Sequence, residues 1–148
     1  MIRHGLISDI PVIMEMAEEF YNTTDYSKFA RFDFDTVLAL TELIILHNIC
    51  IVATDDNDKA VGVLGLWLCP FMFNRNVLTC EEVIWWVKTE FRKSSYGIQM
   101  IQYADDIRKL RGAVNFRMAL LSTSPAGLES VYESLGFNFS EKYFTKVN

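Results

Sequence analysis

The sequence predicts an α+β domain with a mixed α/β sheet, in which an antiparallel meander of strands is followed by a βαβ unit and helices cover both faces. The first observation behind this prediction is the order of apolar patterns along the chain, β-α-α-β-β-β-α-β-α-β. The second is their spacing, because short polar turns join the three central strands, whereas helical segments separate the later ones. Short turns join antiparallel neighbours and helical crossovers join parallel ones, so the sheet should contain both pairings.

The first half of the chain predicts a short strand, two helices and an irregular connection between the helices. Ser8 and Asp9 can cap the first helix, and Pro11 is tolerated in its first turn. Asp35 can cap the second helix in the same way. The expected elements are a strand at 1–4, a helix at 9–21, a polar and aromatic connection at 22–34, and a second helix with the apolar face Val37, Leu38, Leu40, Leu43 and Ile44.

The second half predicts the meander, then a helix, a strand, a second helix and a final strand region. Gly112 and Gly136 should follow the ends of these two helices, because glycine adopts the left-handed backbone that closes a helix. The expected spans are strands at 50–54, 60–73 and 77–87, a helix at 97–111, a strand at 116–121, a helix at 125–135, and one or two strand segments within 137–147.

The composition fits one globular domain over residues 1–148. Hydrophobic residues make up 51% and charged residues 22%, which excludes a disordered chain. Aromatic residues, at 14%, predict a thick core, an aromatic-lined cleft or an apolar surface between two copies, so a homodimer stays open. The net charge of −5 argues against a nucleic-acid partner, because neutralising phosphates needs an excess of Lys and Arg.

The cysteines and histidines predict neither disulfides nor a metal site. Cys50, Cys69 and Cys80 each lie in or beside an apolar run, as buried free thiols do in a reducing cytoplasm. No cysteine pair has zinc spacing, and His4 and His47 are far apart in the sequence. There is no signal-peptide pattern and no apolar run of roughly 18–20 residues, so we expect a cytoplasmic protein without a membrane partner.

A basic and hydroxyl-rich turn, Arg92-Lys-Ser-Ser-Tyr-Gly97, stands between an apolar strand and a helix. A helix that begins there points several N–H groups and its dipole at one spot, which attracts phosphate. Arginine and lysine add charge, the serines add hydroxyls, and Gly97 lets the backbone approach a ligand closely. The Walker and Rossmann spacings are absent, and the alternative interpretation is an ordinary solvated turn.

Two segments, one from Val87 to Gly97 and one from Val131 to Phe137, resemble motifs of the GNAT superfamily of N-acetyltransferases. The family signature is Arg/Gln-x-x-Gly-x-Gly/Ala, preceded by V-x-P-x-[YF], and the segment from Val87 to Gly97 follows it position by position. Thr89 stands for the usual proline and Ser95 for the first glycine. The segment Val131-Tyr-Glu-Ser-Leu-Gly-Phe137 is similar to the family's late Leu-Tyr-Glu-x-Leu-Gly-Phe. Both motifs fall in the family's order of elements.

The resemblance implies a GNAT-like fold and an acetyl-coenzyme A-dependent N-acetyltransferase, an acyltransferase that uses acetyl-coenzyme A as co-substrate and no metal. In the family, backbone N–H groups of the signature turn hold the pyrophosphate, and the preceding strand pairs with the pantetheine arm. The implied coenzyme-binding residues are Trp85, Trp86 and Val87 for the arm, and Arg92, Lys93, Ser94, Ser95, Tyr96, Gly97 and Ile98 for the pyrophosphate.

The resemblance also implies catalytic roles. It places the Tyr132 hydroxyl near the coenzyme sulfur as general acid, whereas periodicity alone indicates a half-buried core tyrosine. A family base about eleven residues before the signature arginine corresponds to Glu81. Strand side chains alternate, so Glu81 and Glu82 should face opposite ways, and a bulge could give the role to Glu82. Either carboxylate could instead be a solvated strand charge.

The acceptor implied by the resemblance is an amine of a small molecule or of a peptide or protein, acetylated by direct transfer. In the family, the connection between the first two helices often shapes the acceptor site. Here 22–34 is rich in aromatic residues and carboxylates, which suit a cation, although the aromatic rings could simply pack on the sheet. The rival interpretation is a non-catalytic acyl-coenzyme A-binding or protein-interaction module on the same fold.

Overall fold

The computed structural model describes residues 1–148 and contains a four-stranded antiparallel sheet in the order β1-β2-β3-β4. The predicted meander is confirmed, with its second and fourth strands starting at Ile49 and Asn74, before the expected bounds, and its third strand ending at Phe71, before the expected bound. Leu64 of β3 pairs with Ile51 of β2 on one side and with Trp85 of β4 on the other. The strands are β1 (Ile2–His4), β2 (Ile49–Thr54), β3 (Ala60–Phe71) and β4 (Asn74–Val87).

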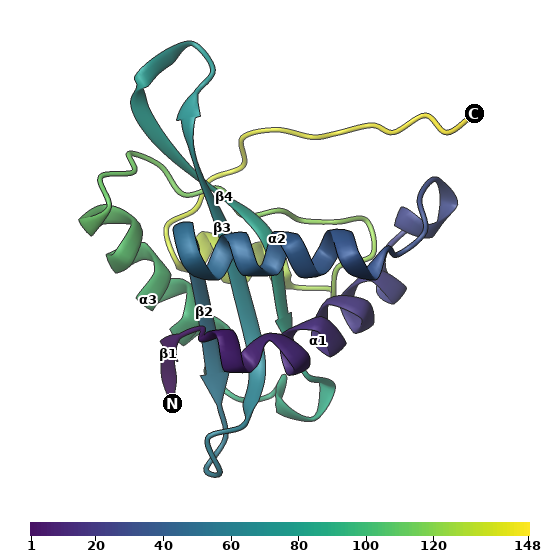
Figure 1. Ribbon diagram of the computed structural model, residues 1–148. Helices are drawn as coiled ribbons and strands as arrows, with labels where there is room; N and C mark the ends of the chain where they lie inside the picture. The colour runs from purple at the N-terminus through teal and green to yellow at the C-terminus, as the bar shows by residue number, and fades with distance from the viewer.

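Helices cover both faces of the sheet, as predicted (Figure 1). One face packs against α1 and α2 through a core that includes Ile13, Met16 and Ile44. The other face packs against α3 and α4 through a core that includes Met100 and Tyr132. None of the helices is long and apolar enough to span a bilayer. The helices are α1 (Ile10–Thr23), α2 (Phe34–His47), α3 (Tyr96–Leu110) and α4 (Leu128–Ser134).

The helix ends follow the sequence signals in part. Gly112 and Gly136 have φ values of 83° and 86°, which confirms both as left-handed residues after α3 and α4. Asp9 lies at the start of α1 but does not cap it, because its carboxylate binds the Arg3 guanidinium over 2.7 Å. The predicted cap of α2 was wrong. Asp33 caps this helix by accepting the Thr36 N–H over 2.9 Å, and Asp35 lies inside the first turn.

The strand predicted at 116–121 is reduced to two isolated parallel bridges beside β4, Ala113 with Leu78 and Arg117 with Glu81. Side chains take up backbone groups that a continuous ladder would use. The Asn115 side chain accepts the Cys80 N–H over 3.0 Å, and the Glu82 carboxylate accepts the Ala119 N–H over 2.8 Å. The chain therefore returns parallel to β4, as a βαβ unit requires, but separates from it after Glu82.

The final strand segments predicted within 137–147 do not form. Phe137 packs its ring 5.3 Å from that of Phe116, and the chain then leaves the body of the protein as an extended segment (Figure 1). Phe139, Tyr143 and Phe144 remain exposed. A strand requires a neighbouring edge to supply hydrogen bonds, and strand-like composition alone cannot provide that edge.

The cysteines are free, and Cys50 and Cys80 are buried. Burial raises the pKa of each of these two thiols to about 12, so neither is a nucleophile at neutral pH.

Candidate active site

The turn before α3 presents four backbone N–H groups without a partner in the chain. The Ser94 N–H donates to the Phe91 carbonyl over 3.0 Å, and the Tyr96 N–H donates to the Ser94 hydroxyl over 3.2 Å. No such bond satisfies the remaining N–H groups of this turn, which belong to Lys93, Ser95, Gly97 and Ile98. Together with the positive end of the helix dipole, these groups form a site suited to an anion.

Ser95 fits the turn without strain. Its φ is −81°, outside the left-handed region in which a side chain causes strain. Its hydroxyl accepts the Gln99 side-chain N–H over 2.6 Å. Gly97 also has no positive φ. A Cβ at Gly97 would lie 3.0 Å from Cζ2 of Trp85, so the close packing of the indole leaves little room for a side chain at this position.

The two cations of the turn differ in their surroundings. The Arg92 guanidinium lies 4.2 Å above the Trp86 ring, and its Nε donates to the Val87 carbonyl over 3.0 Å. The Trp86 indole N–H in turn donates to the Glu19 carboxylate on α1 over 2.8 Å. Lys93 is exposed and has no ion-pair partner. Arg92 is therefore fixed in place, and Lys93 is free to meet a ligand.

The outer edge of β4 is open beyond Glu82. β4 is the last strand of the sheet, and its bridges to the returning chain stop at Glu81. On this edge the backbone between residues 83 and 87 has a single partner, the Arg92 side chain on the Val87 carbonyl. The side chain of Trp85, a residue of this edge, lies with its ring 5.8 Å from the Tyr132 ring. Its indole N–H is buried and has no hydrogen-bond partner. An extended ligand could pair with this edge.

A bulge in β4 sets the direction of the two glutamates. Leu66 pairs with Glu82 and Gly65 pairs with Ile84, so Val83 has no partner across the ladder. Glu81 Oε1 accepts from Arg117 over 2.8 Å, and Arg117 also pairs with Glu141. Glu81 is thus neutralised by a cation, on the side of the strand away from Tyr132.

Glu82 has a different environment. Its Oε2 accepts the Ala119 N–H over 2.8 Å, and no cation pairs with it. Burial raises the pKa of Glu82 to about 7, although the Ala119 hydrogen bond acts in the opposite direction. A carboxylate with a pKa near neutrality can both accept and release a proton, as a general base requires.

Tyr132 is buried, and its hydroxyl donates to the Ala119 carbonyl over 2.8 Å. Burial, followed by the negative charge of Glu82, raises the pKa of Tyr132 above its usual value, so the hydroxyl stays protonated at neutral pH. Glu82 and Tyr132 therefore meet at one residue, Ala119. The sequence contains no signal for Ala119, because its role rests on backbone groups alone.

The fold matches solved structures over almost its full length. A transcriptional regulator from Bacillus halodurans C-125 is 21% identical, with a TM-score of 0.77 over 100% of this chain and 99% of that one. A putative acetyltransferase from Agrobacterium tumefaciens str. C58 is 18% identical, with a TM-score of 0.73 over 100% and 99%. The glucosamine-6-phosphate N-acetyltransferase of Arabidopsis thaliana is 14% identical, with a TM-score of 0.73 over 99% and 97%.

The chain has the GNAT fold. No family model and no curated protein sequence matches it. At these identities the likeness establishes the fold alone. In this fold, three features lie along the β4 edge of the sheet. They are the unpaired N–H groups at the start of α3, the open edge of β4, and the two side chains that bind Ala119, Glu82 and Tyr132.

Proposed function

We propose that the protein is an acetyl-coenzyme A-dependent N-acetyltransferase that moves an acetyl group directly to an amine of a small molecule or of a peptide or protein. One observation carries the proposal: a carboxylate with a pKa near 7 and a buried tyrosine hydroxyl bind opposite sides of Ala119, beside the open edge of β4. The GNAT fold supports it, because several solved structures of this fold are named N-acetyltransferases.

The free backbone groups fit the two parts of coenzyme A. The pyrophosphate is an anion, which the N–H groups of Ser95, Gly97 and Ile98 and the nearby Lys93 would stabilise. The pantetheine arm carries amides, which can pair with the main chain around Trp85 as an added strand does. When bound, the co-substrate supplies an acetyl thioester that a neutral amine can attack.

Glu82 is the proposed base. An alkylammonium ion must lose a proton before its nitrogen can act as a nucleophile, and Glu82 can accept that proton on a carboxylate oxygen. Glu81 is less suited, because Arg117 holds its carboxylate in an ion pair. The bond from Arg117 occupies the Glu81 Oε1, which is therefore not free to accept a proton from an amine. We assign Glu81 the task of fixing the returning chain at Arg117.

Tyr132 is the proposed acid. Its raised pKa keeps the proton on the hydroxyl oxygen until a stronger base, such as a departing thiolate, comes within reach. The present bond to the Ala119 carbonyl fixes the orientation of the ring, and a modest rotation of the hydroxyl hydrogen would redirect it. After transfer, the second proton of the attacking nitrogen restores the Tyr132 hydroxyl, and the proton taken up by Glu82 leaves to solvent.

The experiment that tests the proposal combines binding with product analysis. The protein is titrated with acetyl-coenzyme A by calorimetry and then incubated with it and a panel of primary amines, with acetylated products detected by mass spectrometry. We expect binding and at least one acetylated amine. Binding without any product would favour the non-catalytic acyl-coenzyme A-binding module. Absence of binding would contradict both functions.

A further inference from the structure

An apolar hollow of about 160 Å³ lies between α1, α2 and β4. Its floor is formed by Val83 and Ile84, and its walls include Ile44 of α2. Phe32 and Tyr26, from the segment that joins the two helices, form its rim. The floor residues face the α1–α2 core but stay only half-buried, so the helices do not close over the sheet here.

The β4 bulge creates this floor. In a regular strand, successive side chains point to opposite faces, but Val83 and Ile84 both pack with the α1–α2 core. The residues that line the hollow are apolar except for the hydroxyls of Tyr21, Tyr26 and Thr41. The Thr41 hydroxyl donates to the Val37 carbonyl over 2.8 Å, and the Tyr21 hydroxyl donates to the Ala30 carbonyl over 2.6 Å. Only the Tyr26 hydroxyl at the rim has no partner in the chain, so the floor and walls below it suit an apolar occupant.

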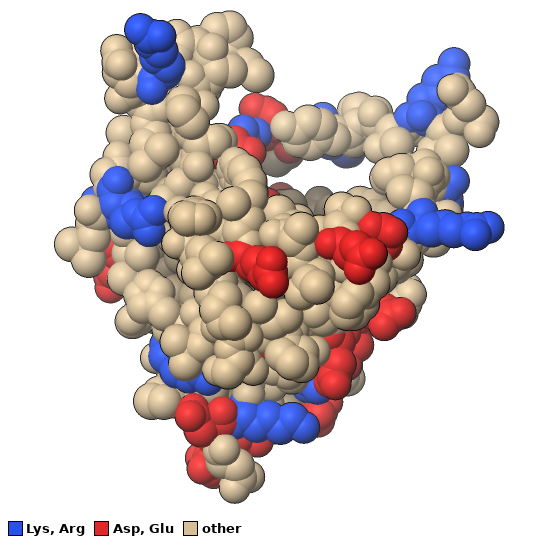
Figure 2. Space-filling model, in the orientation of Figure 1, with Lys and Arg blue, Asp and Glu red and all other residues tan.

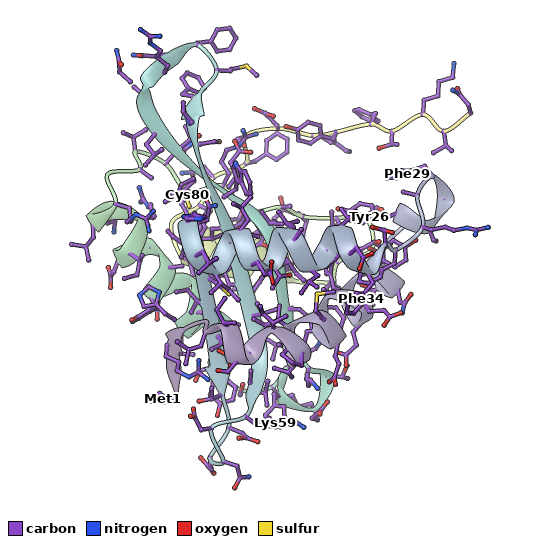
Figure 3. The ribbon with its side chains drawn as sticks, viewed as in Figure 1. Met1, Tyr26, Phe29, Phe34, Lys59 and Cys80 are labelled. Atoms are coloured by element: carbon purple, nitrogen blue, oxygen red, sulfur yellow. The ribbon has the colours of Figure 1, made fainter.

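The rim is held in place by ring contacts. The Tyr21 ring lies 5.4 Å from that of Phe32, and the Phe20 ring lies 6.4 Å from that of Tyr26. Figure 3 shows Tyr26, Phe29 and Phe34 grouped at the end of the molecule where α1 ends and α2 begins. Edge-to-face pairs of this kind add stability beyond burial, so the rim is a built feature and not a loose loop.

Several carboxylates lie near the mouth of the hollow. The Glu82 carboxylate is near enough to Tyr26 to raise the pKa of its hydroxyl further than burial alone. A second hollow of about 350 Å³ shares Phe32 and is lined by Glu15 and Glu18 of α1. Figure 2 shows several acidic side chains on this half of the α1–α2 face, with Lys and Arg side chains at its right margin. A ligand with a positive charge beside an apolar group matches this arrangement.

We propose that the acceptor is a primary amine carrying a compact apolar group of about the size of a phenyl ring. The apolar group occupies the hollow above Val83 and Ile84, and the amine reaches Glu82. The volume is adequate, because a cavity of about 150 Å³ lined by aliphatic and aromatic side chains holds benzene. This inference rests on the proposed function, since it specifies the acceptor of the same site.

The first test compares kcat/KM for 2-phenylethylamine and for propylamine, two primary amines that differ mainly in the ring. Burying a group of this size favours the aromatic amine by about tenfold to hundredfold. The variant Val37→Phe fills the hollow from α2 and should reduce this ratio towards unity. The matched control Leu46→Phe adds a ring to an exposed position of the same helix and should leave the ratio unchanged. Equal rates in the wild type would overturn the inference.

The second test follows binding without turnover. Methyl resonances of Val83 and Ile84 are recorded by NMR during titration with 2-phenylethylamine, in the presence of coenzyme A. Shifts at these methyl groups are expected, and their absence would overturn the inference even if the protein acetylates other amines. Shifts in a protein that acetylates no amine would contradict the proposed function while supporting the ligand class of the hollow.

Discussion

Glu82 and Tyr132, which come from different elements, bind the two sides of a single residue. The Ala119 N–H donates to the Glu82 carboxylate and the Ala119 carbonyl accepts from the Tyr132 hydroxyl, each over 2.8 Å. The charge of Glu82 raises the pKa of Tyr132, and both side chains are held by the same residue. A substitution at one of them should therefore change the proton affinity or the position of the other.

Glu82→Gln should abolish most of the acetyl transfer while leaving coenzyme binding intact. General-base catalysis contributes about 10²–10⁴-fold, so kcat should fall by that order. The matched variant Glu81→Gln should keep kcat within a few-fold, because Arg117 already neutralises this carboxylate. Steady-state rates of both variants with one acceptor check the assignment. Loss of activity in Glu81→Gln alone would assign the base to Glu81.

The stability of the protein should depend on pH through Glu82. Its folded-state pKa of about 7 lies above the ordinary value of 4.5, so the folded state retains a proton that the unfolded chain has lost. The free energy of unfolding should therefore fall as pH rises from about 4.5 to about 7. Glutamine cannot ionise, so Glu82→Gln should be more stable than the wild type at pH 8 by up to about 3 kcal/mol. Urea unfolding of both proteins at pH 4.5 and pH 8 measures the difference, and parallel pH curves would contradict it.

Tyr132→Phe should lower kcat by about 10²–10⁴-fold with little change in the dissociation constant of acetyl-coenzyme A. The ring would still pack against Trp85 and Phe137, whereas the hydroxyl proton would be absent. Because the Ala119 carbonyl also loses its donor, a modest loss of thermal stability is expected. Rates and calorimetric affinities separate the two effects, and an unchanged kcat would exclude Tyr132 from proton transfer.

Ser95→Gly should leave the affinity for acetyl-coenzyme A within about twofold of the wild type. Ser95 has a negative φ, and the backbone N–H groups that would bind the anion do not depend on its side chain. Replacing a helix N-cap residue by glycine costs only a few tenths of a kcal/mol, so stability should hardly change. A large loss of affinity in calorimetry would instead identify the Ser95 hydroxyl as a ligand.

Trp86→Phe should weaken coenzyme binding several-fold, although Trp86 itself faces α1. The indole holds Arg92 on its face and is itself fixed by Glu19, so the change loosens the first residue of the turn. Glu19→Gln is the matched control, because glutamine still accepts the indole N–H and should preserve affinity. Equal affinity in wild type and Trp86→Phe would show that Arg92 needs no such support.

The sequence was sufficient for the meander, for the existence of the four helices and for the ends at Gly112 and Gly136, because these depend on local periodicity and backbone preference. The start of α4 was predicted too early, at 125, because the left-handed Gly127 delays the helix to Leu128. The position of the bulge at Val83 could not be predicted, since it depends on the pairing between β3 and β4. The same holds for the interrupted strand beside Cys80 and Glu82, where side chains replace backbone partners. Glu81 and Glu82 could therefore be ranked only after the strand register was known.

The most direct measurement is a two-dimensional amide NMR titration with acetyl-coenzyme A. If the turn before α3 and the edge of β4 hold the co-substrate, the largest shifts should occur at the N–H groups of Ser95, Gly97 and Ile98 and at Trp85. Binding that leaves these four amides unshifted, or shifts confined to α1 and α2, would contradict the proposed site.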